Sequence, residues 1–167
     1  FLSITTLSSS SISNLNYSLY LSMNINDLER AKKYCAYQER CHSDVRSRLL
    51  EWKIYGDDLE EIIVALIEEN YLNEERFAKA YVSGKFNMNH WGKNKISQAL
   101  KAKHISDYCI RKGLEVIQDE DYIRTIKQIL EKRSREKKTH SSFQLSQYLM
   151  SRGFEYNLVS KILEHEG

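Results

Sequence analysis

The apolar residues of this chain recur at helical spacing, and the same pattern returns three times. Five positions are apolar in every copy. Because hydrophobic residues make up only 41% of the chain, this agreement is not expected by chance. The three copies are Val45, Leu49, Ile54, Leu59 and Ile63; then, 51 residues on, Ile96, Leu100, Ile105, Ile110 and Leu114; then, a further 49 on, Leu145, Leu149, Phe154, Val159 and Leu163.

Each copy is interpreted as two helices joined by a short turn, preceded by a longer helix. The long helices are expected at about 27–40, 74–88 and 119–137. The chain contains no proline, which fits helices joined by short turns, and no sustained alternation suggests strands. We therefore predict an all-α fold with an amino-terminal extension over residues 1–26 and three three-helix units over 27–72, 73–118 and 119–167.

Polar residues and glycines at the expected helix ends indicate where the shorter helices begin and stop. Gly153 is expected to end its helix in a left-handed conformation. The expected amino-terminal caps are Ser43, Asp57 or Asp58, Ser106 or Asp107, and Ser141 or Ser142.

Charge is unevenly distributed, although the formal net charge is only +2. Residues 57–75 hold eight acidic residues and no basic one, whereas residues 76–103 hold seven Lys/Arg and no acidic one. Such segregation favours docking onto phosphates or an acidic protein surface. Trp91 stacks on a base, covers an apolar patch on a partner protein, or only fills a gap between helices. The predicted contact residues are Arg76, Lys79, Lys85, Trp91, Lys93, Lys95, Lys101, Lys103, Lys132, Arg133, Arg135, Lys137 and Lys138.

Catalytic and metal-binding patterns are missing from the sequence. There is no phosphate-binding glycine loop, nucleophile elbow or H-E-x-x-H string, and the five histidines are scattered. The three cysteines have neither disulfide-framework nor zinc-site spacing, which favours a reducing cytoplasm. We expect a cytoplasmic, non-enzymatic protein that needs no metal or other cofactor, and no apolar run approaches a membrane span.

The first 22 residues differ from the rest of the chain. They contain eight serines and no charged residue, and the chain starts with Phe1. They have neither the basic start nor the continuous apolar core of a secretory signal. We expect no stable structure there. Either native translation starts at Met23 and these residues are upstream sequence, or they form a genuine disordered tail.

A run of residues in the second predicted unit resembles the RecX family of recombination regulators. The resemblance is carried by Tyr71 through Val82 (YLNEERFAKAYV), Trp91 through Ile96 (WGKNKI), and Leu100 with His104, Ile105 and Ser106. It is centred on residues 66–117 and extends, more weakly, over about 28–167. It implies tandem three-helix units that form an elongated, curved array.

The resemblance also implies a function, since RecX-like proteins bind the RecA–single-stranded DNA filament and restrain its ATPase and strand exchange. Positive charge would then meet DNA phosphates or an acidic RecA surface, and a monomer suffices for this task. Two alternatives stay open. One is a stand-alone nucleic-acid-binding module, with salt-sensitive affinity for DNA. The other is a helical scaffold for an unrelated partner.

Overall fold

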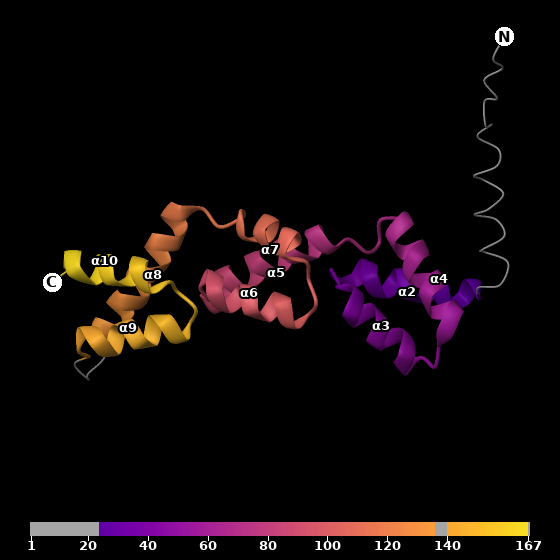
Figure 1. The fold of residues 1–167 in the computed structure, drawn as a ribbon, viewed down its shortest axis with the longest axis horizontal. Coiled ribbons are helices and arrows are strands. Elements are labelled where there is room, and N and C mark those ends of the chain that lie inside the picture. The colour runs from indigo at the N-terminus through magenta and orange to yellow at the C-terminus, as the bar shows by residue number, and fades with distance from the viewer. Residues whose placement is uncertain (1–23, 136–139, 167) are drawn as a thin grey trace, which may run out of the picture. The chain divides into compact units, whose positions relative to one another are not determined.

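The computed structural model describes residues 24–135 and 140–166, and all regular structure in these ranges is helical (Figure 1). The helices follow one another in three triplets with the same order. In chain order they are α2 (Ile25–Tyr37), α3 (His42–Glu51), α4 (Gly56–Glu68), α5 (Glu74–Asn89), α6 (Lys93–Ala102), α7 (Asp107–Leu114), α8 (Asp119–Ser134), α9 (Ser142–Ser151) and α10 (Tyr156–Glu166). The predicted all-helical repeat is confirmed, whereas the elongated, curved arrangement and the three-unit division stay predictions.

By contacts the chain divides into two compact parts, one ending at Asn73 and one beginning at Glu74. The first part holds the first triplet, α2–α4. Its core comes from the apolar stripes of these helices, with Val45, Leu49 and Leu66 at most 1% exposed. The second part holds the second triplet, α5–α7, and the third triplet, α8–α10.

In the second triplet, small residues let two helices approach closely. A Cβ atom added at Gly113 of α7 would lie 3.1 Å from the backbone of Ala78 in α5. These two helices make the most extensive contact of any helix pair in the described chain. Phe77 and Val82 of α5 and Leu100 of α6 are buried in the core.

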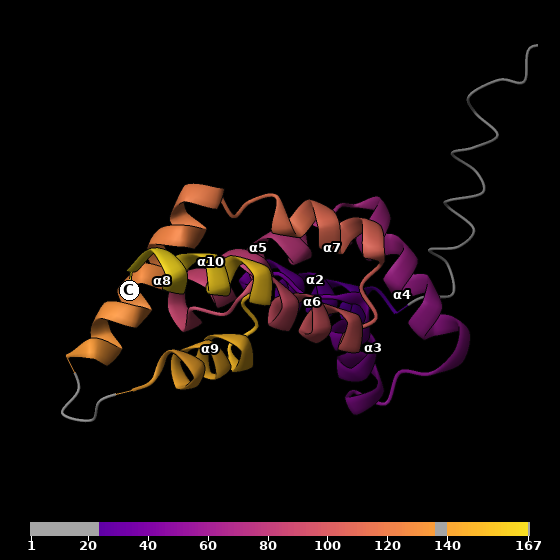
Figure 2. The ribbon, with the colours of Figure 1, turned by 60° about the vertical axis from the view of Figure 1, so that its left-hand side comes forward.

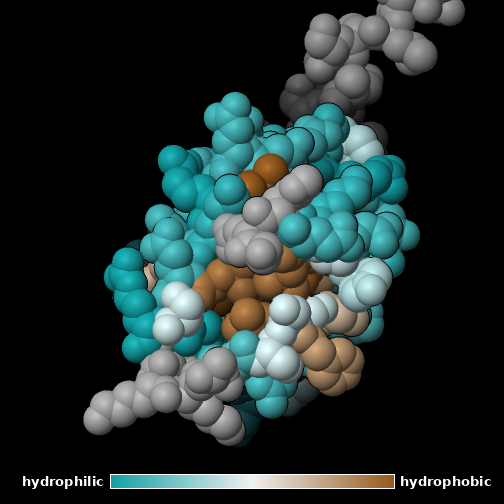
Figure 3. All heavy atoms as spheres, turned by 90° about the vertical axis from the view of Figure 1, so that its left-hand side faces the viewer, coloured by the Kyte–Doolittle hydropathy of each residue, from teal (hydrophilic) through white to brown (hydrophobic). Residues whose placement is uncertain are grey.

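The third triplet is packed more openly. Helices α9 and α10 lie against one another (Figure 2), but α8 makes no comparably close approach to either of them. Helices α5 and α8 are both 16 residues long and begin at 74 and 119, so residues 45 apart are equivalent. Ile123 therefore stands where the second triplet has Ala78. On the 49-residue repeat, Ile162 replaces Gly113. Figure 3 shows hydrophobic side chains gathered on the face formed by this triplet.

The glycine prediction and half of the cap predictions are correct. Gly153 has φ +92°, Ser106 caps α7 through the Cys109 N–H at 3.3 Å, and Ser141 caps α9 through the Gln144 N–H at 3.3 Å. In each case a hydroxyl accepts a hydrogen bond from an otherwise unpaired helical N–H.

The cap predictions in the first triplet are wrong. Cys41, not Ser43, precedes α3, because Asp44 reaches back to the Cys41 N–H. Tyr55 precedes α4, so Asp57 lies in the first helical turn. There its negative charge interacts favourably with the helix dipole.

The first helix also differs from its predicted range of 27–40. It starts at Ile25, because the Asn24 side chain accepts a hydrogen bond from the Asn26 N–H, and it stops at Tyr37. Of the extension predicted over residues 1–26, residues 1–23 lie outside the described ranges, whereas Asn24 caps α2 and Ile25 and Asn26 belong to it. Within those ranges, no helix is both long and apolar enough to traverse a bilayer.

Candidate partner-binding surface

The second and third triplets meet through a close contact between two glycines. A Cβ atom added at Gly92 would lie 2.2 Å from the carbonyl carbon of Gly153, a distance that no real side chain tolerates. The missing side chains let the backbones pair: the Gly92 N–H donates to the Arg152 carbonyl at 2.8 Å, and the Asn94 N–H donates to the Gly153 carbonyl at 3.1 Å. The start of α6 is thereby fixed against the end of α9.

A buried tyrosine closes the other side of this junction. The Tyr122 hydroxyl accepts a hydrogen bond from the Lys93 N–H at 2.8 Å and donates to Glu155 at 2.7 Å. Its ring packs between Phe86 and Phe154, at centroid distances of 5.9 and 5.2 Å. Burial, with the hydrogen bond to Glu155, raises the pKa of Tyr122 above its usual value. The hydroxyl therefore stays a donor at neutral pH.

Trp91 stands beside the junction between two lysines. Its ring centroid lies 5.0 Å from Nζ of Lys85 and 4.8 Å from Nζ of Lys95, both within the range of a cation–π contact. The Lys95 amine also donates to the Ser151 carbonyl at 3.4 Å. The indole is partly exposed. Only part of its surface therefore fills a gap between helices.

Arg152 joins this lysine–tryptophan group to a second ring. Its Nε donates to the His90 carbonyl at 3.2 Å and another guanidinium nitrogen donates to the Asn89 carbonyl, while Nη1 lies 3.2 Å from the Tyr148 hydroxyl. Arg133 stacks over Tyr148, 3.9 Å from the ring centroid. Partial burial raises the pKa of Tyr148, but hydrogen bonds from Arg133 and Arg152 and their positive charges outweigh it, so the net shift is downward. We call Lys85, Trp91, Lys95, Arg133, Tyr148 and Arg152 the Trp91–Tyr148 surface.

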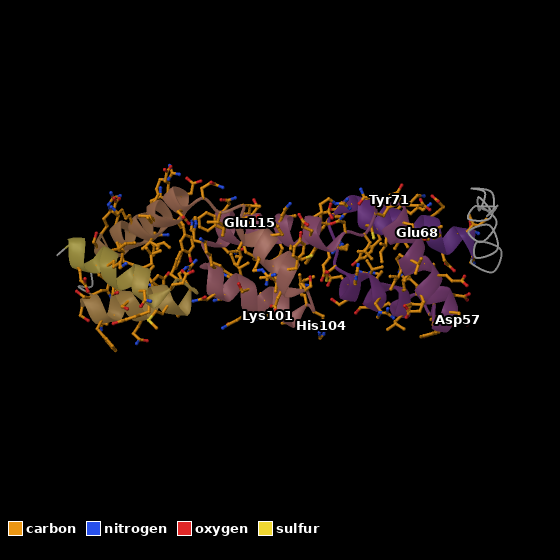
Figure 4. All side chains as sticks on the ribbon, turned by 45° about the horizontal axis from the view of Figure 1, so that its top comes forward. Asp57, Glu68, Tyr71, Lys101, His104 and Glu115 are labelled. Atoms are coloured by element: carbon orange, nitrogen blue, oxygen red, sulfur yellow. The ribbon has the colours of Figure 1, made fainter. Side chains whose placement is uncertain are left out.

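Several predicted contact residues are instead paired with carboxylates. Lys79 pairs with Glu75 at 2.5 Å and Lys93 with Asp119 at 3.2 Å. Lys101, near the end of α6 (Figure 4), pairs with Asp107 at 3.3 Å. These carboxylates come from sequence outside the acid-free stretch, so the basic character of residues 76–103 is partly cancelled in three dimensions.

Lys103 belongs to a repeated pair of a cation and a ring. It lies 5.9 Å from the Phe77 ring centroid, joining the end of α6 to α5. In the first triplet, Trp52 corresponds to Lys103 on the 51-residue repeat, and the Arg30 guanidinium of α2 lies 3.8 Å from its indole centroid. In the first triplet the cation lies in the long first helix and the ring follows the second helix, the reverse of the second triplet. This arrangement indicates that Lys103 holds two helices together.

The other predicted residues are dispersed. Arg76 is partly buried in α5, and Lys132 is exposed near the carboxyl end of α8. Arg135, just after α8, lies 3.5 Å from Glu131. Lys137 and Lys138 lie outside the described residues, so their predicted role stays a prediction.

Two members of the surface, Tyr148 and Arg152, were missed by the sequence reasoning. A signal was present: residues 137–154 contain no acidic residue, as is also true of residues 76–106. A second cation–ring group, in the first triplet, was missed as well. There Arg40 and Arg48 lie 4.4 and 5.1 Å from the Tyr34 ring centroid. Among the described residues, no group of His, Cys, Asp and Glu could hold a metal ion.

Comparison with known proteins gives consistent matches. A family model described as RecX, second three-helix domain, matches residues 73–114, which include α5–α7. The protein named Regulatory protein RecX from Lactococcus lactis subsp. cremoris (strain SK11) is 30% identical over 138 residues, which cover 78% of this chain and 51% of the relative. The protein of the same name from Bacillus subtilis (strain 168) is 29% identical over 139 residues, which cover 81% and 53%.

The chain thus spans about half the length of these relatives. The crystal structure of RecX from Lactobacillus salivarius superposes with a TM-score of 0.69 at 23% identity, over 85% of this chain and 97% of that one. A second structure, of regulatory protein RecX, gives 0.74 at 21% identity, over 98% and 81%. These likenesses concern the fold. Taken with the sequence matches, they lead to one conclusion: the chain belongs to the RecX family.

Proposed function

We propose that this protein binds a RecA–single-stranded DNA filament and inhibits its ATPase and recombinase activity. It acts by binding, as a monomer in the cytoplasm, and carries out no reaction of its own. The observation that carries the proposal is the match of residues 73–114 to the RecX second three-helix domain. That stretch contains Lys85, Trp91 and Lys95, which form the part of the Trp91–Tyr148 surface around Trp91.

The charge distribution supports a polyanionic partner. Lys85 and Lys95 contact the Trp91 ring, and no carboxylate within the described chain pairs with either amine. Cations without a carboxylate partner attract phosphates or acidic side chains more strongly than paired ones, because no internal ion pair must be broken. A RecA filament assembled on DNA offers both kinds of anion.

The test is a titration of this protein into the DNA-dependent ATPase of its cognate RecA. We expect inhibition at or below one protein per RecA subunit. The control repeats the titration with a fivefold excess of single-stranded DNA over the RecA binding capacity. An inhibitor of the filament keeps its stoichiometry to RecA, whereas a protein that only sequesters DNA loses its effect. An unchanged ATPase rate across the whole titration would refute the proposal.

A stand-alone nucleic-acid-binding module is the second candidate, favoured by the tryptophan flanked by two lysines. It predicts DNA affinity that falls steeply with salt, because each neutralised phosphate releases counterions. It predicts no effect on RecA beyond competition for DNA. The excess-DNA control above separates the two candidates.

A further inference from the structure

The Trp91–Tyr148 surface is assembled where two stretches without acidic residues cross. Residues 76–106 and 137–154 both lack Asp and Glu. The glycine contact brings them together, since Gly92 donates to the Arg152 carbonyl at 2.8 Å. Positive charge from two distant parts of the sequence is thereby concentrated at one place.

Arg152 makes this surface continuous. It contacts the carbonyls of Asn89 and His90, directly before Trp91, and also the Tyr148 hydroxyl. Each ring is flanked by two cations, Trp91 by Lys85 and Lys95, and Tyr148 by Arg133 and Arg152. A ligand lying across Arg152 would therefore meet two aromatic rings and several positive charges in succession.

This combination fits one chemical class of ligand better than others. An acidic protein surface would use the cations but not the rings. Duplex DNA would use the cations but hides the faces of its bases. A single strand offers both phosphates for the cations and exposed bases for stacking, and such binding combines a basic track with aromatic side chains. Lysine side chains are flexible enough to move from the ring face to a phosphate while a base takes their place.

We propose that the Trp91–Tyr148 surface binds single-stranded nucleic acid directly, with a base stacked on Trp91 and phosphates at Lys85, Lys95 and Arg152. This inference deepens the proposed function. It rests on the proposed function for the identity of the bound strand, which is the single strand of the RecA filament. The Trp91–Tyr148 surface then contacts the DNA strand, and other parts of the chain contact the RecA subunits of the filament.

The two tryptophans of the chain, Trp52 and Trp91, allow a direct test. In the Trp52→Phe variant, Trp91 is the sole reporter, and its fluorescence should be quenched saturably by oligo-dT without RecA. In the matched Trp91→Phe variant, Trp52 is the sole reporter. It also lies beneath an arginine, at 3.8 Å, but in the first triplet, and we expect no quenching there.

Charge variants in the Trp52→Phe background test the phosphate contacts. Lys85→Gln with Lys95→Gln should weaken oligo-dT binding about tenfold or more and lower the salt slope by about 1.4, at about 0.7 per phosphate contact on a single strand. Lys101→Gln, whose amine is already paired with Asp107, should change affinity less than about twofold. Circular dichroism verifies that each variant keeps its helicity.

Three outcomes would overturn the inference: no quenching of Trp91 at saturating oligo-dT, equal quenching of Trp52, or equal binding of poly-glutamate, which would mean that charge alone suffices. The RecA ATPase titration keeps this test separate from the proposed function. Undiminished ATPase inhibition without DNA binding would refute the surface assignment only, whereas DNA binding without any effect on RecA would refute the proposed function only.

Discussion

The second and third triplets have the same helix order but differ in how closely their helices pack. In the second, Gly113 and Ala78 allow α7 to approach α5 until a Cβ at Gly113 would be 3.1 Å from the Ala78 backbone. In the third, the equivalent residues are Ile162 and Ile123, and α8 stays farther from α9 and α10. Two larger side chains change the spacing of helices whose order and apolar pattern stay the same.

The wider spacing has a consequence for charge. The cation–ring pair formed by Lys103 and Phe77 has its equivalent in Arg152 and Tyr122. Tyr122 instead binds Glu155 and the Lys93 N–H, and Arg152 turns to the carbonyls before Trp91. A position that holds two helices together within one triplet thus joins two triplets, and it adds a cation to the proposed binding surface.

The largest expected effect comes from removing an equivalent core leucine from each triplet. Leu100 and Leu149 are both 0% exposed, and each substitution by alanine should lower the free energy of unfolding by about 2–5 kcal/mol. We expect Leu100→Ala to cost more, because tightly packed helices relax less around a cavity. Urea denaturation measures both. A larger loss for Leu149→Ala would contradict the difference in packing.

Gly92→Ala should separate the two triplets. Its methyl group would lie 2.2 Å from the Gly153 backbone, so the junction must open and lose its hydrogen bonds, at about 3 kcal/mol. The matched control is Gly84→Ala, where a Cβ meets no atom within 4 Å inside helix α5; it should stabilise by about 0.5–1 kcal/mol. Equal stability of the two variants would show that the glycine contact does not hold the junction.

A smaller effect on stability is expected at alkaline pH, through Tyr122 in the third triplet. The pKa of Tyr122 is raised in the folded state by burial and by Glu155, so folding favours the neutral hydroxyl. Its contribution to stability is complete below the pKa of an unfolded tyrosine, about 10, and is lost as pH rises above that value. Tyr122→Phe should lower stability at pH 7 and flatten its decline above pH 10. Thermal unfolding across this range measures both, and an unchanged slope would exclude this role.

The smallest effect on stability is expected from reversing single charges. Lys101→Glu should leave stability within about 0.5 kcal/mol and partner binding nearly unchanged, because Lys101 is exposed and already paired with Asp107. Lys95→Glu should weaken partner binding about tenfold, because its amine lies over Trp91 without a carboxylate. Filament-binding assays compare the two variants, and circular dichroism checks their helicity. Lost helicity in either would mean that its lysine supports the fold.

Much of the helical arrangement could be predicted, because it depends on local spacing. The apolar stripe with Leu100 at its centre is buried as expected, and the left-handed turn at Gly153 is present. Helix ends were predicted less well, as Cys41 in place of Ser43 illustrates. An amino-terminal cap depends on which side chain reaches a free N–H, and neighbouring residues compete for it.

The candidate site was predictable only in outline. The basic character of residues 76–103 follows from the sequence, and so does the placing of Trp91 beside it. Which cations are neutralised does not, because the carboxylate that pairs with Lys93 lies at Asp119, 26 residues along the chain. The hydrogen bond from Arg152 to the His90 carbonyl likewise joins residues that are far apart in the sequence, 62 positions from one another.

The sequence by itself therefore determined the helical class, the threefold recurrence of an apolar pattern and the family. These properties reside in residue spacing and in short motifs, which every copy carries locally. Tertiary structure alone decided which lysines keep unpaired charge and that Tyr148 and Arg152 join Trp91 at one surface. The physical reason is the distance over which charge and packing act. Ion pairs and the glycine contact depend on a few ångströms in space, and residues far apart in the chain reach that separation only after the helices have packed.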